Sequence, residues 1–484
     1  MEKENFFNEM QRKYMLFEES LHTGVAFDLG ELEAILMADF FSNFNMCDRS
    51  VKLLEYGLES YPDSQEIKKF LSFAYISLNQ LKKAEKLLDE IKQHDPTNLF
   101  VILANGAYCL KTDQKKLALE LFEIIEDLAS HKEKTQLLYR IGVALVQANM
   151  PEEAMTYYGK CLEINPDQLF AKMGYASCFN RLGNWEKALE QYKEILEKTP
   201  YVIYAWYSLG DIYRQQGMSD EAIEAYDYVL AIDPTSAPAM YNKAKILLKQ
   251  KKAEEAAEIF CELNSKEIDK ESRGEILIYL LECYNILERY EEIINVCKQL
   301  VFYYPDSVNG WSGMSMSYLN LGEWEKSIVP LKTLLSIDPD LPDYWQYLGM
   351  AYDEKDMRAE AVEAYLEAYN RQEKNIYLII RLINACDASG RMADALKYSL
   401  EAFEIQPDTK GLDYGIGALY HQLGRLDELK AHLKMLMERG NVDAPLLFLE
   451  SYPPARYDLA EFTAQYYPDY DPDAWEDDEE CFTD

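Results

Sequence analysis

Apolar and small residues recur along this chain with a period of 34 residues. Each period holds two runs in which apolar residues return every three or four positions, which predicts two amphipathic helices separated by a turn. Prolines end the second run at Pro62, Pro96, Pro166, Pro200, Pro234, Pro305, Pro339 and Pro407. The irregular spacings indicate about two extra residues near 133–134 and about three near 271–273.

Two positions of the repeat carry small residues, which indicates where its two helices approach most closely. Position 8 is small at Ala38, Ser72, Gly106, Gly142, Ala176, Gly210, Ala244, Ser315, Gly349 and Gly417, and position 20 at Ser50, Ala84, Ala118, Ala154, Ala188, Ala222, Ala256, Ser327, Ala361 and Ala395. Leu281 and Ile383 interrupt the first series, and Ile293 and Leu429 interrupt the second. Because one hairpin cannot bury its apolar face alone, neighbouring units are expected to stack.

This pattern resembles the tetratricopeptide repeat (TPR) family over residues 31–443. The resemblance implies an all-α fold, an α-solenoid in which about twelve helical hairpins stack into a right-handed superhelix. The predicted repeats begin at Glu31, Gln65, Leu99, Thr135, Leu169, Ile203, Ala237, Gly274, Val308, Pro342, Ile376 and Lys410. Helix A opens each repeat and helix B follows it. The uninterrupted array looks like the standalone TPR proteins common in bacteria.

The ends of the array need caps that cover its outermost apolar faces. Residues 1–30 are expected to form an N-terminal capping helix and a connector, because Phe6, Met10, Tyr14, Phe17 and Leu21 lie at helical spacing. Two short capping helices are predicted within 444–467, at 444–452 and 457–467. The last segment, 468–484, carries nine acidic residues and no basic one, and is predicted to be a disordered tail.

Charge and composition narrow the possible functions. The chain has 49 Lys and Arg against 85 Asp and Glu, a formal net charge of −36. This charge argues against binding to nucleic acids or anionic membranes, which requires clustered positive charge. The first 20 residues carry charge throughout and no run of 18 apolar residues exists, so the sequence predicts a cytoplasmic location.

The sequence shows no recognisable set of catalytic residues. The sequence contains no phosphate-binding loop, no nucleophile elbow and no HExxH motif. Of its five histidines only His421 and His432 share a repeat, with no third ligand evident nearby, and its nine cysteines form no CxxC pair. The repeats also leave no segment long enough for a catalytic domain. We therefore expect no enzyme activity, no catalytic residue, no cofactor and no metal site.

The concave face of a TPR array is lined by helix A, and the resemblance places candidate binding residues there. Across the middle repeats these positions, here called the A-helix stripe, hold Tyr139, Arg140, Asn180, Arg181, Tyr204, Tyr207, Asp211, Arg214, Tyr241, Asn242, Lys245 and Lys249. Arg and Lys pair with carboxylates, Asn bonds an extended backbone, and Tyr offers contact area with a polar tip. The stripe therefore suits an acidic or extended peptide segment. The alternative is a solvated polar surface that binds nothing specifically.

The carboxylate clamp of many co-chaperone TPR domains is absent as a set. Asn242 matches one of its positions, but the preceding repeat carries Tyr207 and Asp211 where the clamp needs Lys and Asn. The following repeat carries Glu275 and Tyr279 where the clamp needs Lys and Arg.

Two functional classes remain. One is a non-catalytic scaffold or adaptor that holds a protein or peptide partner in its groove. The other is an accessory or regulatory subunit of an enzyme assembly whose catalytic residues lie on a partner.

A further hypothesis concerns the acidic tail, which contains Trp475, the one Trp outside the repeats. Its charge complements the basic A-helix stripe, so the tail is a candidate for an intramolecular contact that competes with a partner. The alternative is a tail that only increases solubility.

Overall fold

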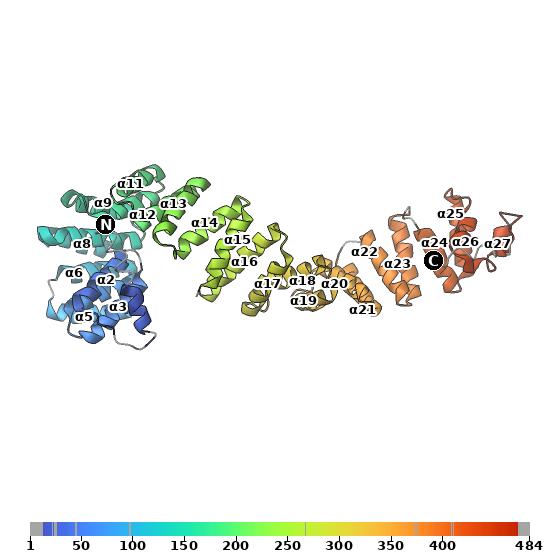
Figure 1. The fold of residues 1–484 in the computed structure, drawn as a ribbon, viewed down its shortest axis with the longest axis horizontal. Helices are drawn as coiled ribbons and strands as arrows, with labels where there is room; N and C mark the ends of the chain where they lie inside the picture. The colour runs from blue at the N-terminus through green and yellow to red at the C-terminus, as the bar shows by residue number, and fades with distance from the viewer. Residues whose placement is uncertain are drawn as a thin grey trace. The chain divides into compact units, whose positions relative to one another are not determined.

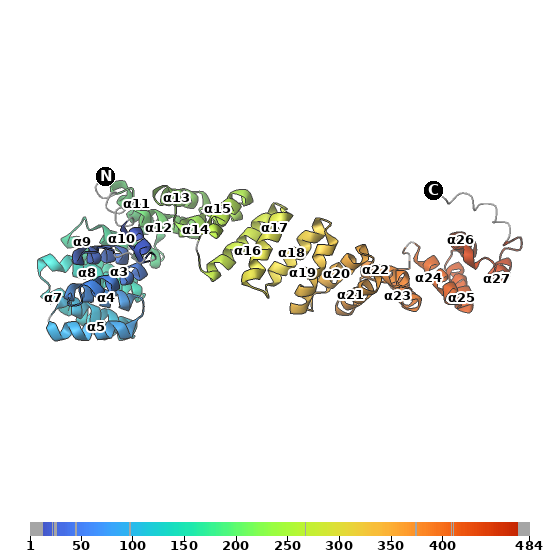
Figure 2. The ribbon, with the colours of Figure 1, turned by 60° about the horizontal axis from the view of Figure 1, so that its bottom comes forward.

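The computed structural model describes residues 13–21, 23, 27–43, 46–95, 98–266, 268–372, 375–407, 409 and 411–472. All regular structure within these ranges is helical, in agreement with the predicted α-solenoid. The chain divides into two compact units, Met1–Gln250 and Lys251–Asp484, which are described separately. Within each unit, consecutive helices pair as hairpins that stack in chain order (Figures 1 and 2).

The helices have the following bounds. The first unit contains residues 13–21, α2 (Glu31–Asn43), α3 (Cys47–Ser60), α4 (Gln65–Ser77), α5 (Leu81–His94), α6 (Leu99–Lys111), α7 (Lys115–Leu128), α8 (His131–Gln147), α9 (Pro151–Ile164), α10 (Leu169–Arg181), α11 (Trp185–Lys198), α12 (Ile203–Gln215), α13 (Ser219–Ile232) and α14 (Ala237–Lys249). The second contains α15 (Ala253–Ser265), α16 (Lys270–Ile286), α17 (Tyr290–Tyr303), α18 (Val308–Asn320), α19 (Trp324–Ile337), α20 (Pro342–Glu354), α21 (Arg358–Arg371), α22 (Ile376–Ala388), α23 (Met392–Ile405), α24 (Leu412–Gln422), α25 (Leu426–Glu438), α26 (Ala444–Ser451), a 3₁₀ turn (Pro453–Ala455) and α27 (Ala460–Ala464).

Helix A begins at the predicted residue in every repeat except the fourth, the eighth and the twelfth. In the fourth and eighth repeats it begins early, at His131 and Lys270, so the extra residues add a helical turn instead of lengthening a loop. In the twelfth it begins late, at Leu412, because Gly411 precedes it with a left-handed φ of 83° that cannot continue a helix.

An aromatic ring from helix B lies against the small residue at position 8 of helix A. A Cβ added at Gly142 would lie 2.5 Å from the ring of Tyr158, and one added at Gly349 would lie 2.5 Å from the ring of Tyr365. Both rings are buried. Position 8 must therefore be small, because the aromatic ring of helix B fills the space that a larger side chain at this position would occupy.

The turn between helices A and B places one residue in the left-handed region. In the second to twelfth repeats this residue is Asn79, Asp113, Asn149, Gly183, Gly217, Lys251, Glu288, Gly322, Asp356, Gly390 or Gly424. In all of these repeats except the seventh, the residue after it closes the turn by donating its N–H to the carbonyl five residues back, as in the 2.8 Å bond from Gln80 to Tyr75. This is the hydrogen-bond pattern of a Schellman motif, which satisfies the last carbonyls of helix A.

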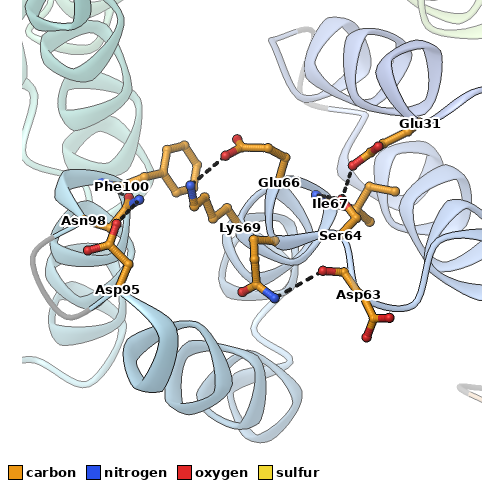
Figure 3. A network of polar contacts seen from close by, with 10 residues as sticks. Glu31, Asp63, Ser64, Glu66, Ile67, Lys69, Asp95, Asn98 and Phe100 are labelled. Atoms are coloured by element: carbon orange, nitrogen blue, oxygen red, sulfur yellow. Dashed lines mark hydrogen bonds and ion pairs between the residues drawn. The ribbon is translucent and has the colours of Figure 1, made fainter.

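Side chains at the start of helix A cap its free N–H groups and link neighbouring repeats (Figure 3). The Ser64 hydroxyl accepts the N–H of Ile67 at 3.1 Å and donates to Glu31 of the preceding A helix at 2.5 Å. Asn98 caps the next A helix by accepting the N–H of Phe100 at 3.0 Å. Such caps typically contribute about 1 kcal/mol each.

Tryptophan at position 4 joins the start of a repeat to the end of the repeat before it. In three repeats its indole N–H donates to the carbonyl of the proline that follows the preceding B helix. The bonds run from Trp206 to Pro200 (2.7 Å), from Trp311 to Pro305 (2.7 Å) and from Trp345 to Pro339 (2.9 Å).

At the N-terminus, the described residues 13–21 form a helix as predicted, with Tyr14 and Phe17 buried. Leu21 is 49% exposed, so the apolar face of this helix covers less than the sequence suggested. Phe6 and Met10 lie outside the described residues.

At the C-terminus, α26 matches the first predicted capping helix. The second is shorter than predicted, because α27 spans Ala460–Ala464 only and a 3₁₀ turn precedes it. Phe448 of α26 packs where a Cβ on Gly417 would lie, 2.6 Å from the ring. A capping helix thus supplies the aromatic ring for the last repeat. Most of the acidic tail, including Trp475, lies outside the described residues.

Replacing Trp206 with Phe tests the link between repeats. The variant keeps an aromatic ring beside Tyr228, whose ring centroid lies 4.1 Å away, but loses the bond to Pro200. We expect a loss of about 1 kcal/mol in unfolding free energy and faster amide exchange at the start of α12. Urea unfolding and hydrogen exchange measure the two effects. Trp185→Phe, on an exposed indole, is the control; an equal loss there would contradict the assigned role.

Candidate functional site on the A helices

The first two residues of the A-helix stripe, Tyr139 and Arg140, are not accessible. Both lie on α8, with exposed fractions of 6% and 4%. The ring of Tyr139 lies 6.1 Å from that of Tyr158 and 6.3 Å from that of Phe170. Their assignment to a binding surface is therefore corrected, because both side chains pack inside the first unit.

Arg140 is enclosed by aromatic rings and paired with a carboxylate. Its guanidinium lies 4.8 Å from the ring centroid of Phe70, 5.4 Å from that of Phe100 and 5.8 Å from that of Phe73. It also forms an ion pair with Asp39, which comes from the first repeat. The A helices of the first four repeats thus fold onto one another at this point.

The sequence analysis did not predict that these A helices pack against one another around Arg140, although residues at their groove-facing positions indicate it. Asp39, Phe70, Phe73 and Phe100 all occupy A-helix positions that face the groove of a TPR array. Large aromatic residues at such positions favour a face that packs inward, because exposing three phenylalanines to water is costly.

The burial of Arg140 predicts unequal effects when either partner is removed. Asp39→Ala leaves a buried cation without its carboxylate, whereas Arg140→Leu leaves a carboxylate whose side chain is already 29% exposed. We expect Asp39→Ala to cost about 3 kcal/mol or more and Arg140→Leu to cost less. Urea titrations of the two variants make the comparison. Equal costs, or the reverse order, would show that the pair is not the stabilising feature.

The other ten residues of the stripe lie on α10, α12 and α14 of the first unit, the A helices of three consecutive repeats. Arg181, Arg214 and Lys249 are exposed. The remaining seven, Asn180, Tyr204, Tyr207, Asp211, Tyr241, Asn242 and Lys245, are partly buried. The structure therefore leaves a partly accessible stripe in repeats five to seven.

A hydrogen bond within the stripe connects two of its helices. The amide of Asn242 on α14 donates to the hydroxyl of Tyr207 on α12 at 2.9 Å. Burial, with a smaller contribution from Asp211, raises the pKa of Tyr207, so its hydroxyl stays protonated. Because Asn242 is held by Tyr207, the one residue that matched the carboxylate clamp already has an intramolecular partner.

The charges of the stripe are partly neutralised from within. Arg214 pairs with Asp211, one turn away on α12, and Gln215 donates to the same carboxylate at 3.1 Å. This bonding raises the pKa of Arg214. Arg181 and Lys249, by contrast, have no ion-pair partner in the described part of the chain. These two cations are the best placed to bind a carboxylate from another molecule.

The buried cysteines of the described repeats are poor nucleophiles. Cys47, Cys109, Cys161, Cys178, Cys283, Cys297 and Cys386 are buried, and Cys261 is exposed. Burial raises the pKa of the Cys161 thiol to about 11 and that of Cys297 to about 12. A thiol with a raised pKa reacts poorly because the thiolate is the nucleophile.

Alkylation should distinguish these cysteines. At pH 8 we expect iodoacetamide to modify Cys261 at least about tenfold faster than Cys161 or Cys297, because the two buried thiols are both shielded and protonated. Mass spectrometry of peptides from a time course measures each site. The rates should converge in urea, and equal rates in the native protein would contradict the burial.

Two further features complete the chemistry of the described residues. They contain no group of three or more His, Cys, Asp or Glu side chains arranged to hold a metal ion. None of their helices combines the length and the apolar character needed to cross a bilayer.

Comparison with known families agrees with the stacked hairpins. Models of the tetratricopeptide repeat match residues 203–236, residues 48–100 and 145–208, and residues 225–258. The chain is a tetratricopeptide repeat protein. No curated protein matches this TPR protein.

Solved structures of other proteins also match this TPR protein. A tetratricopeptide repeat protein from Parabacteroides merdae ATCC 43184 is 14% identical, covers 52% of this chain and 99% of its own, and has a TM-score of 0.33. A protein named MamA is 19% identical, covers 42% of this chain and 90% of its own, and has a TM-score of 0.22.

Proposed function

We propose that this TPR protein is a non-catalytic scaffold that holds an extended, acidic segment of a protein partner along repeats five to seven. TPR repeats in general mediate interactions between proteins. The observation that carries the proposal is the position of Arg181 and Lys249, which are exposed and lack an internal ion-pair partner within the described chain. They lie at the ends of α10 and α14, with α12 between them in the chain.

The surrounding residues support an extended peptide as the partner. Four cations of the stripe, Arg181, Arg214, Lys245 and Lys249, stand against one carboxylate, Asp211, in a chain whose net charge is −36. The local charge is therefore opposite to that of the whole molecule. Partly buried Tyr204 and Tyr241 provide ring surface, and Asn180 carries an amide that can donate to and accept from a peptide backbone.

A binding assay with matched peptides tests the proposal. The probe is a fluorescein-labelled peptide of alternating Glu and Ser, compared with one of alternating Gln and Ser, at about 0.15 M salt to screen long-range repulsion. We expect the Glu peptide to bind more tightly. The double variant Arg181→Gln/Lys249→Gln should weaken it by about tenfold or more, because two charge-assisted bonds are lost.

The control removes the same charge from another surface. Lys86 and Lys187 are exposed lysines on the B helices α5 and α11. Lys86→Gln/Lys187→Gln should leave binding unchanged, and both double variants should keep the helical circular dichroism of the wild type. Equal binding of the two peptides, or equal loss in both double variants, would reject the stripe as an acidic-peptide site.

A further inference from the structure

Helix α7, the B helix of the third repeat, carries a row of aliphatic side chains on its outer surface. Leu117 and Ile124 are each 43% exposed, Leu128 is 67% exposed, and Leu121 is partly buried. These four residues are here called the α7 seam. The opposite side of the same helix already fills the core, where Ala118, Phe122 and Ile125 are fully buried. Leu121 also packs against this core, so Leu117, Ile124 and Leu128 are the members of the α7 seam that lie outside the apolar face the fold needs.

The other repeats show what the fold alone requires at these positions. The third residue of every other B helix is charged: Arg49, Lys83, Glu153, Lys187, Glu221, Glu255, Glu292, Lys326, Glu360, Asp394 and Glu428. In α7 it is Leu117. The tenth residue of the other B helices is Tyr56, Glu90, Lys160, Glu194, Tyr228, Glu262, Gln299, Thr333, Glu367, Glu401 or Met435, whereas in α7 it is Ile124. Because eleven sibling repeats fold with other residues there, packing within the solenoid does not explain Leu117 and Ile124.

The spacing of the seam matches a known mode of helix pairing. Its residues follow one another at intervals of four, three and four positions, which is the heptad spacing of a coiled coil. At this spacing the side chains form one narrow stripe that a second helix covers along its length. An extended peptide would not match it, because alternate residues of a strand point to opposite sides.

Charges beside the seam define the partner further. Glu120 and Asp127 each precede a seam residue by one position, which is where flanking charges lie in a coiled coil, and both are exposed. Glu123 is exposed on the same helix, and Lys116 is 3.9 Å from Glu120. The flank is therefore mainly acidic. If a second copy paired with α7 in antiparallel orientation, Leu117 would face Leu128 and Glu120 would approach Asp127 of the copy, which like-charge repulsion disfavours.

We propose that the α7 seam binds an amphipathic helix of a partner protein, with aliphatic residues at heptad spacing and Lys or Arg beside them. This site lies on a B helix and is separate from the A-helix stripe, so the two surfaces can engage different partners. A surface of this kind suits a subunit that is fixed in an assembly through one face and leaves its A helices open.

The experiment uses the full chain and a designed probe. The probe is a labelled peptide of three heptads with Leu at the a and d positions, Lys at e and g, and Ala elsewhere; its lysines also prevent self-pairing. Two matched peptides carry Glu at e and g, or the residues of the Lys peptide in scrambled order. Leu117→Gln/Ile124→Gln removes apolar surface without changing charge, and polar residues at both positions are compatible with the fold in sibling repeats.

We expect the Lys peptide to bind the wild-type protein. The Glu and scrambled peptides should bind the wild type at least about tenfold more weakly, and the Lys peptide should bind the double variant at least about tenfold more weakly. Val329→Gln, which removes a 66% exposed valine from helix α19, should bind like the wild type. Equal binding of the Lys and scrambled peptides would show attraction to the acidic chain alone and overturn the proposal. Full binding by Leu117→Gln/Ile124→Gln would do the same.

Analytical sedimentation tests whether a second copy of the chain, instead of a partner helix, occupies the α7 seam. We expect the wild type and Leu117→Gln/Ile124→Gln to have the same mass in solution. A wild-type dimer that the double variant abolishes would assign the α7 seam to a second copy of the chain and reject the partner helix. In either case the binding of the Glu–Ser peptide to the A-helix stripe should be unchanged by Leu117→Gln/Ile124→Gln, so failure at one surface is distinguishable from failure at the other.

Discussion

The contact between an aromatic ring of helix B and a residue with little or no side chain on helix A sets the geometry of this protein. Tyr158 shows how far the contact reaches. A Cβ on Gly142 of the same repeat, or on Gly174 of the next, would lie 2.5 Å or 2.4 Å from its ring. One buried ring therefore fixes both the spacing within a hairpin and the approach of the following A helix. Because the ring occupies the space between helices, the other faces are free to vary in sequence.

The A-helix face illustrates that freedom, because the same repeat positions serve two purposes in the first unit. In repeats two and three they hold Phe70, Phe73 and Phe100, which surround a buried arginine. In repeats five to seven they hold cations, asparagines and tyrosines that remain partly or fully accessible. The fold is common to both regions, and the choice of side chains decides whether the face is core or surface.

The helix bounds could be predicted from the sequence, whereas the burial of part of the A-helix stripe could not, because the two depend on different physical features. Helix bounds depend on local spacing, so the A helices begin where the period places them unless extra residues or Gly411 intervene. The burial of Arg140 depends on how four hairpins add their small rotations, which no single spacing encodes. The α7 seam was in the sequence, since Leu117 is the one uncharged residue at its position, but its meaning needed the exposed fractions. The proposed binding roles of the stripe and the seam stay predictions.

The pair of Arg140 and Asp39 joins residues 101 positions apart in a fold whose helices mainly contact helices close to them in the chain. A linear array of this kind normally loses its terminal units one at a time, because each depends only on the next. Here the release of the first repeat exposes an arginine three repeats away. The first four repeats are thereby coupled, so this end of the chain should open as a single cooperative block, and closing the long loop that the pair spans should make its assembly slower than that of the repeats beyond it.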